Sequence, residues 1–388
     1  MEWKLGQLSI NGKGTYGIGA PAVPLNSSLF TYLRITDIAD DGTLQREGRA
    51  SIDDPDAINY LLKENDIVFA RTGNSTGRTY FYEPSEGDLV YAGFLIKFSL
   101  DPNKVNPRIL KYYTHSKPYY DWIHSFDTGA TRGNINAKTL AEMPVYLPER
   151  KIQDKIVDIL SSLDAQIENN NRINRNLEAQ AQALFKSWFV DFEPWGGKMP
   201  EGWKEGKLGE IISQETKKVG TRTDVTVLSP ITTGRLVLSE EFFTKQVYSA
   251  SLAKYKVVEI GSFAYNPARV NIGSMGRNEF DFIGCVSPVY VVFRCLIGYE
   301  NYFDLLRKTD DFKTEINLRA IGGVRQSLNY EDLARIEIII PSQSAVERFN
   351  TTYDQLKLLI RNNTEANARL ASLRDTLLPK LMKGEIDV

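Results

Sequence analysis

The chain has 388 residues, 42% hydrophobic and 25% charged, which is typical of a globular protein with room for two or three domains. Its net charge of −2 lacks the basic surplus of most nucleic-acid-binding proteins, so any DNA contact requires arginines and lysines gathered on a few surfaces. There is no apolar run of ~18 residues, no signal-peptide pattern and only two cysteines, so we expect a cytoplasmic protein without disulfides.

The first predicted domain covers residues 1–148 and opens with Trp3, Lys4, Gly6 and Leu8. Within it, DIVFARTGNSTGR (66–78) reads as a buried strand that runs into a polar loop. Arginine can bond guanine through two hydrogen bonds, asparagine can do the same with adenine, and small hydroxyl residues can hold phosphates. The loop therefore suits DNA recognition, with an ordinary solvated loop as the alternative.

A long helix is predicted next, at residues 149–190. Apolar residues recur at steps of three and four from Ile152 to Trp188, which is the pattern of a coiled-coil seam. Asn170 and Asn174 interrupt that seam. A short Gly- and Pro-rich linker, residues 191–202, then ends the helix.

The second predicted domain covers residues 203–341, and its opening repeats the first through Trp203, Lys204, Gly206 and Leu208. The stretch GSFAYNPARVNIGSMGR (261–277) has the same strand-then-polar-loop character as 66–78. A second long helix follows at 342–388, and it carries Asn363 and Asn367 where the first carries Asn170 and Asn174.

The two halves form an internal repeat. TGATRGNINAKTLAEMPVYLP (128–148) and IGGVRQSLNYEDLARIEIIIP (321–341) share the pairs Gly129/Gly322, Arg132/Arg325, Asn136/Asn329, Leu140/Leu333, Ala141/Ala334 and Pro148/Pro341. The short linker predicts that the two helices run antiparallel, as a spacer of roughly 55 Å between two similar domains. Asn170 is then expected to meet Asn363 and to fix the register, unless these asparagines face solvent.

Catalytic motifs are weak. His115 and His124 are too few for a zinc site, and GNSTGR at 73–78 lacks the lysine of a phosphate-binding loop. FAYNPAR at 263–269 only faintly matches the Asn-Pro-Pro-aromatic motif of amino-methyltransferases. The sequence therefore predicts no catalytic residue and no metal site.

The order and duplication of these features resemble the specificity (S) subunits of type I restriction-modification systems. The likeness rests on the two phrases at 128–148 and 321–341, on the helices containing NNNRINRNLEAQAQALFKSWFVDF and NNTEANARLASLRDTLLPKLMKGEI, and on the MPEGWK opening. It implies two target recognition domains that read a split double-stranded DNA sequence. It also implies partners: two methyltransferase and two restriction subunits, which carry S-adenosylmethionine, ATP and Mg²⁺, while this chain carries no cofactor.

We therefore expect an α+β (α/β) fold and a non-catalytic DNA-specificity subunit. The rival functions are a coiled-coil adaptor without DNA affinity and a fused methyltransferase or nuclease. The candidate DNA-binding residues are Arg71, Asn74, Ser75, Thr76, Arg78, Arg132, Asn134, Asn136, Arg269, Asn271, Ser274, Arg277, Arg325, Gln326 and Asn329. The candidate register residues are Asn170, Asn174, Asn363 and Asn367.

Overall fold

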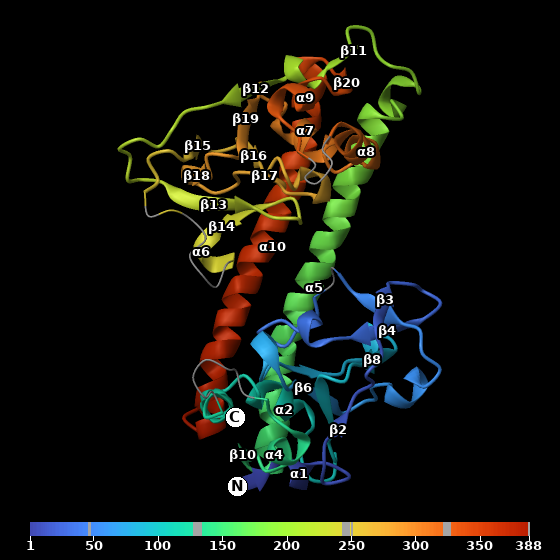
Figure 1. Ribbon diagram of the computed structural model, residues 1–388, viewed down its shortest axis with the longest axis vertical. Helices are drawn as coiled ribbons and strands as arrows, with labels where there is room; N and C mark the ends of the chain where they lie inside the picture. The colour runs from blue at the N-terminus through green and yellow to red at the C-terminus, as the bar shows by residue number, and fades with distance from the viewer. Residues whose placement is uncertain (46–47, 127–133, 243–248, 250, 321–326, 387–388) are drawn as a thin grey trace. The chain divides into compact units, whose positions relative to one another are not determined.

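The computed structural model describes the chain except residues 46–47, 127–133, 243–248, 250, 321–326 and 387–388 (Figure 1). The chain divides into two compact units. Unit 1 comprises Met1–Asn170 and Thr364–Val388, and unit 2 comprises Asn171–Asn363. The two long helices, α5 (Arg150–Phe189) and α10 (Gln343–Lys383), each contribute one part to unit 1 and another part to unit 2.

Unit 1 is built on two four-stranded sheets and a two-stranded pair. One sheet has the order β2 (Thr15–Tyr16), β9 (Leu95–Ser99), β6 (Asp66–Ala70), β7 (Thr79–Phe81). The other has the order β3 (Ala22–Pro24), β5 (Ala50–Ile52), β4 (Phe30–Leu33), β8 (Leu89–Tyr91), and the pair joins β1 (Glu2–Lys4) to β10 (Pro144–Tyr146). Its short helices are α1 (Leu5–Leu8), α2 (Arg108–Tyr113), α3 (Lys117–His124) and α4 (Ala137–Ala141).

Unit 2 has the same plan. One sheet has the order β12 (Ile212–Glu215), β19 (Val291–Cys295), β16 (Phe263–Tyr265), β17 (Met275–Arg277). The other has the order β14 (Leu236–Leu238), β13 (Thr226–Pro230), β18 (Gly284–Val286), β15 (Lys256–Val258), and the pair joins β11 (Lys204–Lys207) to β20 (Glu337–Ile340). Its short helices are α6 (Ser239–Phe242), α7 (Glu300–Leu306), α8 (Asp310–Arg319) and α9 (Tyr330–Ala334).

The repeated phrases end each unit in the same way. Asn136 and Asn329 are the N-caps of α4 and α9, where their side chains accept hydrogen bonds from Thr139 N (2.9 Å) and Asp332 N (2.8 Å). Leu140 and Leu333 are buried, 1% and 0% exposed. These shared residues therefore build a short capped helix before the strands β10 and β20.

The opening repeat aligns differently from the sequence prediction. Lys4 lies opposite Pro144 in one strand pair, and Lys207 lies opposite Glu337 in the other. Pro144 and Glu337 are equivalent positions of the repeat, because they are 193 residues apart. In each unit a glycine then contacts an alanine: a Cβ on Gly6 would lie 3.2 Å from Ala141 Cβ, and one on Gly209 would lie 3.1 Å from Ala334 Cβ. The structural equivalents are thus Lys4-Leu5-Gly6 and Lys207-Leu208-Gly209, so the pairing of Trp3 with Trp203 is wrong.

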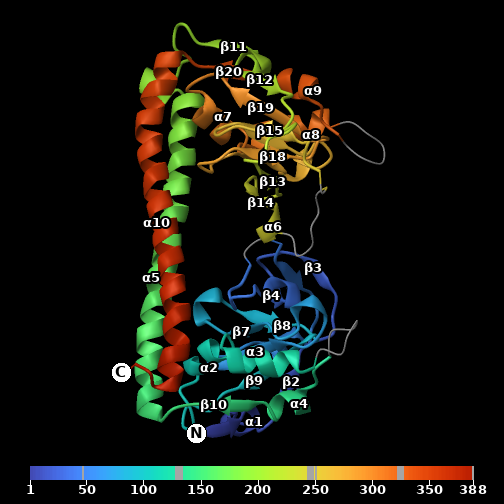
Figure 2. The same cartoon turned by 90° about the vertical axis from the view of Figure 1, so that its left-hand side faces the viewer.

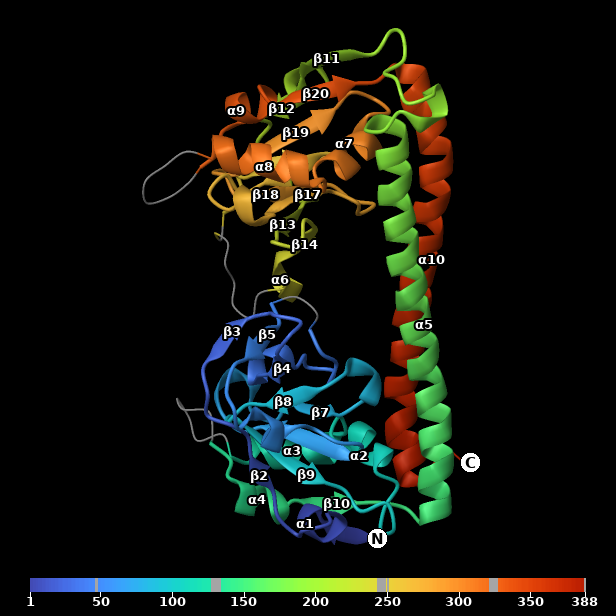
Figure 3. The ribbon, with the colours of Figure 1, turned by 90° about the vertical axis from the view of Figure 1, so that its right-hand side faces the viewer.

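The core of each unit includes parts of both long helices. In unit 1, α5 and α10 run side by side (Figure 2). Leu378 and Leu381 of α10 join Ile156 and Leu160 of α5 in the core that also contains residues of β6 and β9. In unit 2, α7 lies next to α5 (Figure 3). The corresponding core is rich in aromatic rings from both long helices and from α7, namely Phe185, Phe189, Tyr302 and Phe349. Unit 1 is therefore completed by a helix segment that is distant in the sequence, whereas unit 2 is the continuous stretch Asn171–Asn363.

The helix seam differs in detail from its sequence prediction. Ile152 and Ile159 are 37% and 36% exposed, whereas the neighbouring Val157 is 5% exposed. In unit 2, the seam spacing falls on Thr352, but Thr352 is exposed and the adjacent Tyr353 is buried. The spacing of three and four residues predicts the helices correctly. Because each helix also packs against a globular core, the buried stripe is shifted by one residue from the predicted seam.

The asparagines pair across the helices, but not as predicted. Asn170 Nδ2 donates to Asn367 Oδ1 (2.9 Å) in unit 1, and Asn363 Nδ2 donates to Asn174 Oδ1 (2.8 Å) in unit 2. The predicted meeting of Asn170 with Asn363 is therefore wrong by one helical turn. Asn174 lies one turn after Asn170, and its partner Asn363 lies one turn before Asn367. This is the relation expected when two helices run antiparallel.

Candidate nucleic-acid interface

Arg71 directly follows the central strand β6, and its backbone is fixed on both sides. Its N–H donates to Phe94 O (3.1 Å), and its carbonyl accepts from Ile135 N (3.0 Å). Phe94 is 59% exposed, so this end of the sheet lies at the surface. The strand itself is fully buried, because all five residues of DIVFA are packed on one or other face of the sheet.

The Arg71 side chain lies between two partners. Its Nε and Nη2 donate to Asn134 Oδ1 at 3.1 and 3.0 Å, and its guanidinium carbon lies 5.0 Å from the centre of the Tyr16 ring. The Tyr16 hydroxyl accepts from Ala137 N, the first residue of α4, at 3.0 Å. We call Arg71, Tyr16 and Asn134 the Arg71 cluster; it presents donors and an aromatic ring at the surface.

The remaining loop residues of unit 1 have different surroundings. Asn74 is exposed, whereas Ser75 is buried in a short 3₁₀ turn and presents no side chain at the surface. The Thr76 hydroxyl donates to Gly73 O (2.8 Å). Arg78 donates to Asp40 Oδ1 (2.6 Å) and Ile38 O (3.0 Å), so these contacts hold it against its own domain.

In unit 2 too, some of the predicted residues are exposed and others are buried or bonded within the unit. Arg269 is exposed and Asn271 is partly exposed, beside the 3₁₀ turn Val270–Ile272. Ser274 is buried, and its hydroxyl donates to Pro230 O (2.8 Å). Arg277 donates to Asn301 Oδ1 (2.8 Å), and Asn301 in turn donates to Asp354 of α10 (2.9 Å). Arg269 is therefore the surface arginine of this loop.

Burial or local bonding gives several candidates a structural role. Ser75 and Ser274 are buried, and Asn136 and Asn329 cap helices. Arg132, Arg325 and Gln326 lie outside the described residues. Asn134 is exposed, but its side-chain oxygen is already bonded to Arg71.

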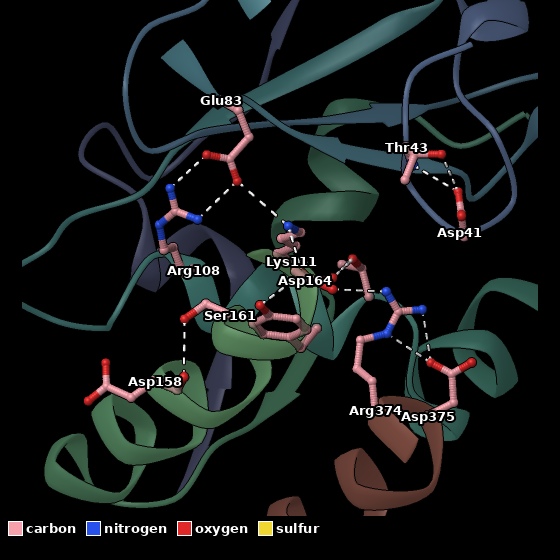
Figure 4. A network of polar contacts seen from close by, with 12 residues as sticks. Asp41, Thr43, Glu83, Arg108, Lys111, Asp158, Ser161, Asp164, Arg374 and Asp375 are labelled. Atoms are coloured by element: carbon pink, nitrogen blue, oxygen red, sulfur yellow. Dashed lines mark hydrogen bonds and ion pairs between the residues drawn. The ribbon is translucent and has the colours of Figure 1, made fainter. Parts of the chain in front are cut away.

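A polar network joins α2 and Glu83, which follows β7, to both long helices of unit 1 (Figure 4). Asp164 of α5 accepts from Arg374 Nη1 (3.0 Å) and Tyr112 OH (3.0 Å) and pairs with Lys111 Nζ (2.9 Å). Lys111 also lies 3.6 Å from Glu83, to which Arg108 donates twice, at 2.9 and 2.6 Å. Arg374, which interrupts the apolar pattern of the second helix, thus forms an ion pair with Asp164 of the first helix.

This network sets the charge state of Asp164. Burial by itself would raise the pKa of its carboxyl group, but Lys111 and Arg374 outweigh that effect and hold the pKa below its usual value. Asp164 therefore remains a carboxylate and accepts hydrogen bonds from α2 and α10 together.

Comparison with known proteins shows which proteins the chain is similar to. Residues 50–179 match the family model for the type I restriction modification DNA specificity domain. The chain is 28% identical over 306 residues to the type I restriction enzyme MjaIX specificity subunit of Methanocaldococcus jannaschii, covering 72% of this chain and 69% of the relative. It is 22% identical over 463 residues to the HindI specificity subunit of Haemophilus influenzae, covering 99% of both.

The chain is similar to the specificity subunits of type I restriction-modification systems. The resemblance to specificity subunits found in the sequence is confirmed by these matches. A crystal structure of the type I restriction-modification S subunit from M. genitalium is similar over 100% of this chain and 96% of its own, with a TM-score of 0.53 and 15% identity. That likeness, together with the sheets and two long helices described above, confirms the predicted mixed fold.

Sequence reasoning missed two surface aromatic residues of this chain. Tyr16 and Phe94, 42% and 59% exposed, lie next to Arg71 although they are 55 and 23 residues away in the sequence. A single sequence carries no signal for such proximity, because it arises from the pairing of β2, β9 and β6.

Two searches of the described residues were negative. No helix among them is long and apolar enough to span a membrane. Within the same part of the chain, no group of three or more His, Cys, Asp and Glu side chains is placed to hold a metal ion.

Proposed function

We propose that this chain is a specificity subunit that recognises a bipartite double-stranded DNA target, with unit 1 contacting one half and unit 2 the other, across a gap of unspecified sequence. The observation that carries the proposal is the repetition of one strand order with different residues at the strand ends. The sheet β2-β9-β6-β7 recurs as β12-β19-β16-β17, but Arg71 and Asn74 follow the first central strand while Arg269 and Asn271 follow the second.

A repeated scaffold with different surface residues supports two recognition events of the same kind but different sequence. Arginine and asparagine are the residues that read guanine and adenine most directly in the major groove. The near-neutral net charge is compatible with this role because Arg71, partly exposed, and Arg269, exposed, supply positive charge locally at the two strand ends.

We further propose that the subunit docks methyltransferase and restriction subunits, two of each. S-adenosylmethionine, ATP and Mg²⁺ would be bound by those partners, which would also supply part of the positive surface that holds DNA.

The proposal is tested by selecting bound duplexes from a library with a randomised centre, using the chain assembled with its methyltransferase partner. We expect two short conserved blocks separated by a fixed gap. Binding should also weaken as salt rises, with a logarithmic slope of about −0.9 per phosphate contacted. A single continuous block would contradict bipartite reading, and an absence of binding at every salt concentration would favour an adaptor.

A further inference from the structure

Among the described residues, the hydrogen bonds of Arg71 leave one edge of its guanidinium for a ligand. A guanidinium has a side edge, formed by Nε and one Nη, and an end edge formed by Nη1 and Nη2. Asn134 Oδ1 accepts from Nε and Nη2, so it occupies the side edge. The end edge carries two parallel N–H donors, and this is the arrangement that matches guanine O6 and N7.

The plane of that edge is also fixed. The guanidinium lies 5.0 Å from the centre of the Tyr16 ring, a favourable cation–π distance. Tyr16 is in turn held by its place in β2 and by the hydrogen bond from Ala137 N at 3.0 Å. A side chain that is already oriented loses less conformational entropy when it binds, so the cluster is preorganised for a planar partner.

The fold uses the backbone carbonyl at this position as a hydrogen-bond acceptor, but it does not require an arginine side chain there. Ile135 N donates to Arg71 O, and the residue 193 positions later, Leu328 N, donates to Pro267 O (3.1 Å). Arg71 and Pro267 are therefore structural equivalents, and unit 2 makes the same backbone closure with a proline. The Arg71 side chain thus serves the surface of unit 1 and is not needed for the shared scaffold.

We propose that Arg71 reads a guanine in the half-site bound by unit 1, donating from Nη1 and Nη2 to O6 and N7. Tyr16 and Asn134 act as positioning residues that hold its plane and its side edge. This inference rests on the proposed function, since it assigns a base to one of the two DNA contacts.

The test is a genome-wide methylation map of cells that express the full chain with its methyltransferase partner. Arg71→Lys keeps the charge but loses the planar pair of donors, and Tyr16→Leu removes the ring beneath it. Tyr16→Phe keeps the ring and loses the bond to Ala137 N, so its effect should lie between wild type and Tyr16→Leu. Arg294→Lys, at a 68% exposed arginine of unit 2, is the matched control.

We expect Arg71→Lys and Tyr16→Leu to relax one G·C position in one block of the motif, with preference for guanine falling about tenfold to a hundredfold. The other block and the Arg294→Lys map should stay unchanged. Thermal unfolding of each variant reports whether it is folded. If Tyr16→Leu does not fold, Arg71→Lys still decides the proposal.

Two results would overturn the assignment. The first is an unchanged motif in Arg71→Lys, as expected if Arg71 contacts only a phosphate. The second is a wild-type motif in which no G·C position changes in either variant. Failure of the proposed function is a separate outcome, because methylation would then persist without the chain or follow a motif that is not bipartite.

Discussion

Asn170 donates a hydrogen bond to Asn367 across the two long helices, with 2.9 Å between Nδ2 and Oδ1, and Asn170 is only 6% exposed. Gln166 Nε2 also donates to Asn170 Oδ1 at 3.1 Å, so both polar atoms of this buried amide are bonded. A buried amide pair forms in one register only, because a shift by one turn would leave each amide against apolar side chains.

Replacing both Asn170 and Asn367 by leucine should therefore stabilise the helix pair while loosening its register. We expect a gain of about 1–2 kcal/mol, since apolar side chains pack in a seam without the cost of burying amides. Asn170→Leu by itself should be less stable than the double variant, because it loses the bond to Asn367.

Thermal unfolding measures the first effect. Cysteine pairs placed at facing positions, in the native register and one turn away, measure the second by which pair cross-links. An unchanged melting temperature, together with cross-links in the native register alone, would show that this pair does not set the register.

How far the sequence predicts this structure depends on the range of the interaction. Both long helices follow from apolar residues at local steps of three and four, and Asn136 and Asn329 are recognisable as possible caps from their own neighbourhoods. The partner of Asn170 could not be predicted. The repeat of 193 residues is equally consistent with Asn363 and with Asn367, which lies one helical turn further on. For the same reason the Arg71 contacts required the sheet pairing that brings Tyr16 and Asn134 to it.

The polar network of unit 1 should make the protein sensitive to acid through Asp164. The folded pKa of Asp164 lies below its unfolded value of about 3.9, so its contribution to stability is fully present above that pH. The contribution is lost as the pH falls through the folded pKa, because the protonated group no longer attracts Lys111 and Arg374.

Asp164→Asn should consequently be less stable than wild type by about 1–3 kcal/mol at neutral pH, and the difference should shrink in acid. Urea unfolding of both proteins at neutral pH and below pH 4 measures this. A difference that stays constant across that range would show that the carboxylate charge is not what holds the network.

Residues near the end of the chain should stabilise its first domain. Leu381 of α10 is 2% exposed in the core that also contains Leu5, Phe69 and Phe98. We expect Leu381→Ala to cost about 2–5 kcal/mol, because it leaves a cavity in that core. Amide hydrogen exchange should then accelerate in unit 1 more than in unit 2.

Leu373→Ala, at a 47% exposed position on the same helix, is the matched control and should change stability by about 0.5 kcal/mol or less. Equal losses for the two variants would contradict the packing of α10 against the first domain.

Arg78 should affect stability more than specificity. The sequence by itself predicts that replacing either Arg71 or Arg78 relaxes one half-site, but Arg78 is held by Asp40 and Ile38 O, as described above. Arg78→Ala should lower stability by about 1–2 kcal/mol and leave both halves of the methylation motif in place. A relaxed half-site with an unchanged melting temperature would instead identify Arg78 as a DNA contact.

The central claim is that this chain alone decides which DNA sequence is modified. The most direct measurement is a methylation map of cells carrying the chain with its methyltransferase partner, against cells lacking only the chain. We expect a motif of two blocks with a fixed gap that disappears when the chain is absent. An unchanged map, with the methyltransferase shown to be active, would contradict it.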